Sequence, residues 1–224
     1  MTTQVESKTV DAAERQSAEK SEAVSRFAMV QGIRREIAEM LAAKKRGFSV
    51  ADYYHLAEVG ILDEDDRVEL IDGEIVLMSP INVPHAYCVK ALTREFYTTA
   101  SEQAVISVQD PIHLSANSEP QPDIALLRPR DDMYAAAHPT PDDILLLVEV
   151  ADSTIDKDRN EKLPRYAKAG VPEVWIASLP DDWVERYRNP VEGEYTDVRQ
   201  FSRGERISPE LLPDAELSVD DILP

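Results

Sequence analysis

The sequence predicts an α/β domain in which helices cover the faces of a mixed β-sheet, preceded by a helical N-terminal extension. Two apolar runs, 122–127 and 144–150, have the length of strands. The second is almost uninterrupted, which is typical of a central strand covered on both faces. Stretches with helical spacing of apolar residues alternate with such runs, as in α/β folds. With 224 residues, 43% of them hydrophobic, the chain can build one sizeable core and little more.

Residues 1–47 are predicted to be a flexible or helical extension, and the folded domain is expected to span residues 48–224. The first 25 residues are rich in Ser, Thr, Glu, Lys and Ala, a composition that buries too little apolar surface to order itself. From Val24 to Leu41 apolar residues recur near helical spacing, which predicts an amphipathic helix. This helix could pack on the domain or on a second copy of the chain.

The first part of the domain is predicted to hold two helices and a hairpin. Ser49 is a good N-cap for a short helix that ends at Gly60. Two strand-like runs within residues 68–78 flank Asp72-Gly73, the strongest short signal for a tight hairpin. After a loop bounded by two prolines, apolar spacing predicts a helix over residues 85–100.

The second part is predicted to hold most of the sheet. Further strands are expected at 105–108, 111–114, 122–127, 144–150 and 174–177, followed by a hairpin of 183–188 and 195–199. The run at 111–114 begins with proline and is therefore placed at a sheet edge. Ser153 and Thr154 can cap a helix that Gly170 ends.

The charge distribution is unfavourable for broad nucleic-acid binding. The formal net charge is -19. Residues 1–47 carry 9 basic and 7 acidic side chains, so the rest of the chain has a net charge of -21. Because phosphate binding depends on Lys and Arg, any DNA contact needs a local basic surface. One segment does contain a cluster of basic residues: Lys157, Arg159, Lys162, Arg165 and Lys168. Acidic residues are interleaved with them, which favours a solvent-exposed helix face as the alternative interpretation.

The remaining bulk features predict a cytoplasmic protein outside the membrane. No apolar run approaches the roughly 20 residues of a membrane-spanning helix, and the N-terminus is polar. The single cysteine, Cys88, excludes an internal disulfide and is expected to be buried. The chain also shows no glycine-rich phosphate loop, no nucleophile elbow and no zinc-ligand spacing among its histidines.

Two carboxylates stand in apolar strands, where burial of a charged group is energetically unfavourable. Glu149 is the one charge in the central apolar strand, and Asp123 begins the neighbouring one. An ionised group there must be paired or bound to a metal. Carboxylates on adjacent strands can converge on one divalent cation, and oxygen ligands suit Mg²⁺ or Mn²⁺. Alternatively, Asp123 is a turn residue and Glu149 pairs with Arg159 or Lys162.

A set of short motifs in a fixed order strengthens the metal-site interpretation. In chain order they are Glu69-Leu70-Ile71-Asp72-Gly73-Glu74, Ser79-Pro80, His85, Gln121-Pro122-Asp123-Ile124, Val148-Glu149-Val150, Ser153-Thr154, Asp158-Arg159, Lys162, Tyr166, Ala169-Gly170-Val171 and Glu173-Val174-Trp175. In these motifs the chain resembles the PD-(D/E)xK, or restriction-endonuclease-like, superfamily, and within it the Uma-type restriction endonucleases. The resemblance spans most of residues 48–180 and does not include the N-terminal extension.

The resemblance implies a magnesium-dependent endonuclease acting on DNA. Asp123 and Glu149 would bind Mg²⁺ or Mn²⁺. The superfamily pattern asks for a lysine at Ala151, and here Lys162 on the next helix would supply that charge instead. Pro164 favours a helix that starts, or is kinked, near Lys162. Glu69 would assist, although the hairpin turns it away from Leu70, so we expect it not to share that residue's burial.

Three more residues are candidates for substrate binding, each with a structural alternative. His85 could approach the phosphate or be incidental at its helix start. Arg159 could contact phosphate or pair with an acid. Tyr166 is expected on the same helix face as Lys162 and could bind phosphate or pack.

Double-strand cleavage needs two sites, so a homodimer is predicted. The competing interpretation is an inactive nuclease-fold protein that serves as a binding or scaffold module, since like charge repels DNA.

Overall fold

The computed structural model describes residues 47–63, 65–152 and 158–224. The helix predicted over residues 24–41 and the caps expected at Ser153 and Thr154 lie outside these ranges. The chain divides into two compact units, one ending at Asp66 and one from Arg67 to Pro224. Each unit is described by itself.

In the first unit, the predicted short helix is α2 (Val50–Glu58). Its N-cap Ser49 and Asp52 form a capping box: the Asp52 amide donates to Ser49 Oγ at 3.1 Å, and the Ser49 amide donates to Asp52 Oδ2 at 2.9 Å. Two of the amides at the helix start, which have no intrahelical acceptor, are thereby satisfied. The chain leaves the helix through Gly60, whose φ of 71° suits glycine.

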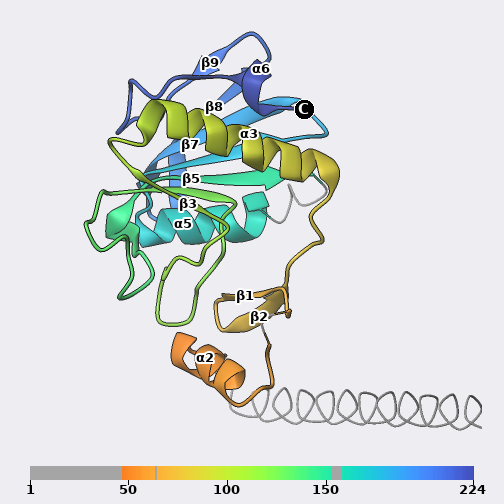
Figure 1. The fold of residues 1–224 in the computed structure, drawn as a ribbon, viewed down its shortest axis with the longest axis vertical. Helices are drawn as coiled ribbons and strands as arrows, with labels where there is room; N and C mark the ends of the chain where they lie inside the picture. The colour runs from red at the N-terminus through yellow and green to blue at the C-terminus, as the bar shows by residue number, and fades with distance from the viewer. Residues whose placement is uncertain (1–46, 64, 153–157) are drawn as a thin grey trace, which may run out of the picture. The chain divides into compact units, whose positions relative to one another are not determined.

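The second unit is built on a six-stranded mixed sheet in the order β3-β4-β5-β6-β7-β8 (Figure 1). The strands are β3 (Val105–Val108), β4 (Ile124–Leu127), β5 (Ile144–Ala151), β6 (Glu173–Ser178), β7 (Trp183–Val191) and β8 (Glu194–Ser202). Only β5 and β6 are parallel to each other among these neighbours. Every residue of β5 is buried, so the predicted central strand and the mixed α/β fold are confirmed.

Helices cover both faces of this sheet (Figure 1). On one face α3 (Val83–Ala100) packs Leu92 and Phe96 against Val148 of β5 and against Trp175. On the other face α5 (Leu163–Ala169) packs among the residues that alternate with these, such as Leu147. Side chains of a strand alternate between faces, so Glu149 projects to the α5 side.

Smaller elements complete the unit. The predicted hairpin is present as β1 (Val68–Ile71) and β2 (Glu74–Leu77). Its turn residues Asp72 and Gly73 have φ of 47° and 83°, the left-handed pair that a tight two-residue turn needs. A 3₁₀ turn η1 (Pro141–Asp143) precedes β5. The C-terminus adds β9 (Arg206–Ile207), β10 (Leu217–Ser218) and α6 (Val219–Ile222).

Three predicted elements differ from the structure. The strand expected at 111–114 is not formed, because Ile112 and Leu114 donate their amides to Pro120 and Ser118 of the same loop instead of to the sheet. The helix α3 begins two residues early, since Asn82 caps it and Pro84 is tolerated in a first turn. The helix before Gly170 consists, where described, of a π-helical turn η2 (Asp158–Lys162) followed by α5.

Cys88 is buried in α3, as predicted. Burial, with a smaller contribution from the charge of Asp123, raises the pKa of its thiol to about 12. We therefore expect the native protein to resist alkylation by iodoacetamide at pH 8, since only the thiolate reacts. Mass spectrometry should find the adduct only after unfolding in urea, and fast labelling of the native chain would contradict this arrangement.

No helix in the described ranges is both long enough and apolar enough to cross a bilayer.

Candidate active site

A pocket opens at the end of the sheet where β4 begins and β5 ends. Its wall comes from β1, the loop after β2, the start of α3, the strand ends and η2. Its charged lining residues are Arg67, Glu69, Asp123, Glu149, Asp152 and Lys162. Acids outnumber bases in this set, so the pocket has a carboxylate-rich floor that favours cations.

The sheet register brings Asp123 and Glu149 together. In the antiparallel β4–β5 pair Ile124 lies opposite Val148, so Asp123 and Glu149 are the next residues beyond this pair at the end of the ladder. The Val150 amide, one residue after Glu149, donates to Asp123 Oδ2 at 2.8 Å. The 25 residues between the two acids therefore do not separate them, and both acids line one pocket. Their joint binding of one cation stays a prediction.

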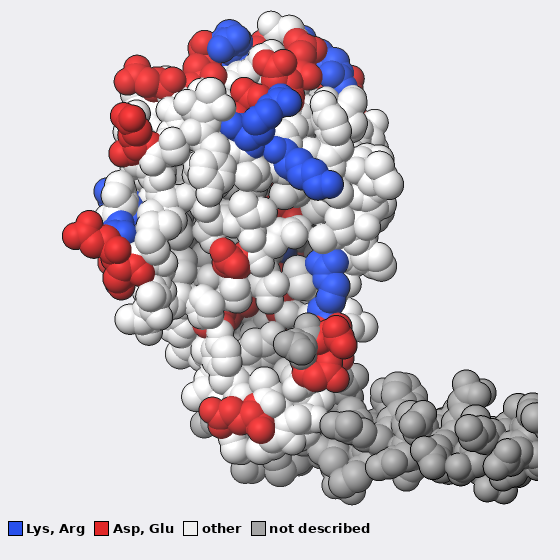
Figure 2. All heavy atoms as spheres, in the orientation of Figure 1, with Lys and Arg blue, Asp and Glu red and all other residues white. Residues whose placement is uncertain are grey.

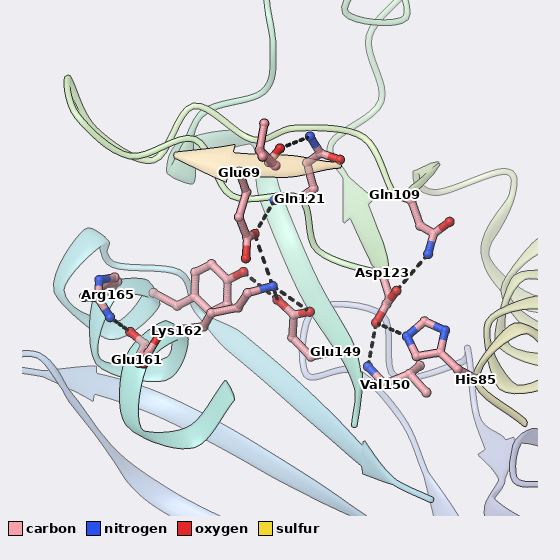
Figure 3. Close-up of polar contacts among 12 residues, drawn as sticks. Glu69, His85, Gln109, Gln121, Asp123, Glu149, Val150, Glu161, Lys162 and Arg165 are labelled. Atoms are coloured by element: carbon pink, nitrogen blue, oxygen red, sulfur yellow. Dashed lines mark hydrogen bonds and ion pairs between the residues drawn. The ribbon is translucent and has the colours of Figure 1, made fainter. Parts of the chain in front are cut away.

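Asp123 is held by three donors (Figure 3). His85 Nε2 lies 3.2 Å from Asp123 Oδ2, and the Val150 amide donates to the same oxygen at 2.8 Å. Gln109 Nε2 donates to the other oxygen at 3.0 Å. Burial by itself would raise the pKa of the Asp123 carboxyl, but these donors, His85 first among them, more than offset burial and lower that pKa. The group is thus kept ionised and fixed in orientation.

Glu149 is paired with Lys162. The Lys162 ammonium lies 3.2 Å from Glu149 Oε1 and 3.3 Å from Oε2. The Tyr166 hydroxyl donates to Oε1 at 2.6 Å. Glu149 and Lys162 are only 4% and 8% exposed, so this is an ion pair in a low-dielectric setting. Lys162 and Tyr166 reach the same carboxylate from one helix face, as their spacing of four residues predicts.

Glu69 belongs to the same cluster (Figure 3). Its Oε2 lies 3.4 Å from Lys162 Nζ and accepts from the Gln121 amide at 3.3 Å. The expectation that Glu69 cannot share the burial of Leu70 is wrong: they are 2% and 0% exposed. Strand β1 is buried along its whole length, whereas β2 is partly exposed, so Leu70 enters the core while Glu69 faces the pocket.

The donor set fits a hard divalent cation. Asp123 and Glu149 supply carboxylate oxygens, which Mg²⁺ and Mn²⁺ prefer, and Mg²⁺ keeps several of its waters. Across the described ranges, no three His, Cys, Asp or Glu side chains are grouped as metal ligands. An ion bound here would have the carboxylates of Asp123 and Glu149 as candidate ligands, completed by water or backbone oxygens.

Comparison with known proteins adds to this geometry. The family model Uma2, described as "Putative restriction endonuclease", matches residues 50–220. The chain belongs to the Uma2 family. The family assignment supports a nuclease and agrees with the resemblance seen in the motifs. No curated protein matches the chain.

One solved structure is similar to this Uma2 member in fold. It is described as a putative nuclease belonging to DUF820 from Anabaena variabilis. The TM-score is 0.62 at 14% sequence identity, and the match covers 78% of this chain and 97% of that one. At this identity the likeness concerns the fold, which is that of the sheet and helices described above.

The position at which the motif resemblance expects a lysine is buried in this Uma2 chain. Ala151, at the position where the motif has lysine, is fully buried in the α5-side cluster. A cation is present nearby in Lys162, and Pro164 lies in the first turn of α5, which begins directly after that lysine. The chain is already helical before Lys162, because η2 runs directly into α5, so the helix changes from π to α geometry at this point.

Of the other candidates, two join the site and one does not. His85 contacts Asp123, and Tyr166 contacts Glu149. Arg159 is paired with Glu185, at 2.6 Å between Nη2 and Oε2, and lies over the Trp183 ring. It does not line the pocket. The structure thus shows the ion-pair alternative for Arg159, and its contact with phosphate stays a prediction. The partner acid lies on β7, far along the sequence.

Two glutamines line the pocket that were not among the candidates from the sequence. Gln109 follows β3 with a φ of 57°, and its side chain and amide both bond to Asp123. Gln121 brings its amide to Glu69. Gln121 stands in the motif that carries the family resemblance, so a signal for it existed. Gln109 has none, because its role depends on the backbone turn after β3.

Proposed function

We propose that this protein is a metal-dependent endonuclease that hydrolyses phosphodiester bonds in DNA, with Mg²⁺ or Mn²⁺ as cofactor. The observation that carries the proposal is the single pocket in which Asp123, Glu149 and Lys162 converge from two adjacent strands and one following turn. Family membership supports a nuclease, and the carboxylate pair supports a divalent cation.

Each residue has a role that follows from its contacts. A bound divalent cation would supply Lewis-acid activation of water and would neutralise phosphate charge. Asp123 and Glu149 would hold it. His85 and Gln109 fix the Asp123 carboxylate, and Tyr166 fixes that of Glu149.

Lys162 is the group that would meet the phosphate. Its ammonium would stabilise the charge that develops on the phosphate oxygens when water attacks phosphorus. Glu69 also lies beside the Lys162 ammonium, and its carboxylate can hold the attacking water by accepting a hydrogen bond from it.

The test is cleavage by the purified full-length chain. Supercoiled plasmid and single-stranded circular DNA are incubated with Mg²⁺ or Mn²⁺, and the control contains EDTA. Manganese binding is followed by electron paramagnetic resonance in parallel. We expect metal-dependent nicking and one bound ion per site. Absence of both cleavage and bound manganese would reject the proposal.

A scaffold role is the alternative, and one observation favours it. The Glu149 carboxylate is already balanced by Lys162 and Tyr166, so the cluster is complete as an ion-pair network without a metal. A scaffold would bind no manganese at micromolar concentrations and would cut nothing, whereas its stability would still depend on these residues.

The proposed enzyme is a homodimer in which two sites cut two strands. The basis is the apolar spacing of residues 24–41, which offers a face for a second copy. We expect light scattering to give the dimer mass for the full chain and the monomer mass after deletion of residues 1–47. A monomer mass in both cases would contradict this arrangement.

Two parallel ion pairs link the β1–β2 hairpin to η2 and α5, and they carry a prediction. The inner pair is Lys162–Glu69 at 3.4 Å. Three residues along both elements, Arg165 Nε lies 2.8 Å from Asp72 Oδ2. Glu69 and Lys162 are almost fully buried, whereas the outer pair is 28% and 57% exposed. The outer pair thus fixes the separation of the elements that deliver Glu69 and Lys162.

We expect Arg165→Met to slow cleavage by about tenfold, because misplacement of a catalytic group by about 1 Å can cost up to a hundredfold. Its unfolding free energy should change by at most about 1 kcal/mol, as for exposed pairs. Arg165→Lys should recover part of the rate. Arg199→Met, which breaks the exposed pair with Glu205, is the control and should cut normally. A wild-type rate for Arg165→Met would reject a positioning role.

A further inference from the structure

The outward face of α3 carries an ordered row of aromatic and basic side chains. Tyr87, Lys90, Arg94 and Tyr97 are separated by three, four and three residues, so they lie on one helix face. All four are exposed, with Tyr87 at 48% and Tyr97 at 57%. We call these four residues the α3 stripe. The opposite face is buried in the core through residues such as Phe96. The side chains of the stripe therefore do not pack against the sheet.

The α3 stripe is a local cationic surface on an acidic domain. Glu95 is the only acid in α3. It pairs with Arg94 at 2.7 Å, but the Arg94 side chain is 66% exposed and that of Glu95 only 22%, so the guanidinium is the group offered to solvent. Figure 2 shows Lys and Arg over α3, with uncharged surface on one side of them and acidic side chains on the side toward β9 and α6. Such a surface complements a polyanion.

The stripe starts at the end of α3 that borders the pocket. Asn82, the N-cap of α3, and His85 in its first turn both line the pocket. His85 lies on the buried side of the helix and Tyr87, two residues further, on the outward side. A ligand that leaves the pocket around the first turn of α3 meets Tyr87 first and Tyr97 last. The rise of the helix between these two is about 15 Å, which a few nucleotides of an extended strand can span.

We propose that the α3 stripe binds an unpaired stretch of a DNA strand whose scissile phosphate occupies the pocket. This inference rests on the nuclease function proposed above. Tyr87 and Tyr97 can stack only on bases whose faces are open, and a duplex hides those faces. Lys90 and Arg94 would contact the phosphates between the stacked bases.

The charge of the surroundings disfavours a duplex. Tight duplex binding uses about 6–10 phosphate contacts, and the stripe offers two cations. Asp221 of α6 lies within electrostatic range of Arg94, so acidic side chains border the stripe and would repel the backbone of a second strand. A single strand avoids that repulsion. The reacting groups are also buried, and a flexible strand reaches them more easily than a stiff duplex.

The test measures binding of the full chain in EDTA, where no cleavage occurs. The probes are a fluorescein-labelled oligothymidylate of about 15 nucleotides and a duplex of equal length, followed by anisotropy. Wild type should prefer the single strand. The double variant Tyr87→Ala/Tyr97→Ala should lose about 30-fold in single-strand affinity, whereas Tyr87→Phe/Tyr97→Phe keeps the rings and should bind normally.

A second variant tests the cations. Lys90→Ala/Arg94→Ala should reduce the slope of log affinity against log salt by about 1.4, the value for two phosphates of a single strand. Arg199→Ala changes an exposed arginine of β8 that has a comparable acidic partner, Glu205; it is the matched control and should leave the slope unchanged.

Three outcomes would overturn the inference: no preference for the single strand, wild-type affinity in the tyrosine-to-alanine variant, or loss of a dimer in light scattering by that variant with DNA binding intact. The last would show that a second copy covers the stripe. If the stripe variants weaken DNA binding but the wild type cleaves nothing in Mg²⁺ or Mn²⁺, the proposed nuclease function is rejected and DNA binding by the α3 stripe is retained. If the protein cleaves DNA and the stripe variants cleave it equally well, the nuclease function is retained and the role of the α3 stripe is rejected.

Discussion

Replacing Lys162 by methionine should destabilise the protein by about 3–5 kcal/mol, the usual cost of removing one partner of a buried ion pair. The ammonium contacts both Glu149 and Glu69, at 3.2 and 3.4 Å, and both acids are nearly inaccessible to water. Without it, two carboxylates share a low-dielectric pocket with no cation between them. Urea unfolding monitored by tryptophan fluorescence measures the change.

Two further variants isolate the electrostatic cause. Lys168→Met changes an exposed lysine on the same helix and should cost less than about 1 kcal/mol. Adding Glu149→Gln to Lys162→Met removes one uncompensated charge and should recover part of the lost stability. If the double variant were less stable than Lys162→Met, packing and not charge would be the main contribution of the lysine.

If the proposed function holds, Asp123→Asn and Glu149→Gln should each reduce cleavage by at least about a thousandfold, because each would remove a charge that holds the proposed cation. The two amides are close in size to the acids, so the pocket keeps its shape. Manganese affinity should fall in parallel with activity. A plasmid-nicking assay with a titration of Mn²⁺ from micromolar to millimolar concentrations separates lost binding from lost chemistry.

The controls for these variants come from acids outside the pocket. Asp142→Asn, in the exposed turn before β5, should leave both cleavage and manganese binding unchanged. Cleavage that survives both Asp123→Asn and Glu149→Gln would place the active centre elsewhere. Unchanged manganese binding combined with lost cleavage would show that the carboxylates act on water or phosphate and not on the ion.

The two carboxylates could be predicted from the sequence because burial makes them costly. Glu149 interrupts an apolar strand, and Asp123 begins its neighbour, so each required a partner of some kind. The sequence left two possible partners open, a metal or a cation of the chain. The structure shows Lys162 against Glu149 and His85 against Asp123, so both carboxylates have partners from the chain itself.

The burial of Glu69 and the pairing of Arg159 could not be predicted, for different reasons. Alternation along β1 gives the direction of Glu69 relative to Leu70, but not that the loop holding Gln121 covers the second face. The partner of Arg159 is Glu185 on β7, and no local pattern connects residues that far apart in the chain. The failed strand at 111–114 has a similar cause, since its amides find acceptors within their own loop.

Hydrogen bonds join the two ends of the loop between β4 and β5, and none of them involves the residues in the middle of the loop. The Arg128 amide donates to the Asp143 carbonyl at 2.8 Å, and the Arg128 side chain donates to the Asp142 carbonyl at 2.9 Å. Residues 131–133 and 135–138 beyond this closure are exposed. The ladder, and not the loop, therefore sets how the two acids face each other. This loop tip is accordingly a natural insertion point, where an affinity tag or a fluorescent label can be added while the catalytic geometry is preserved.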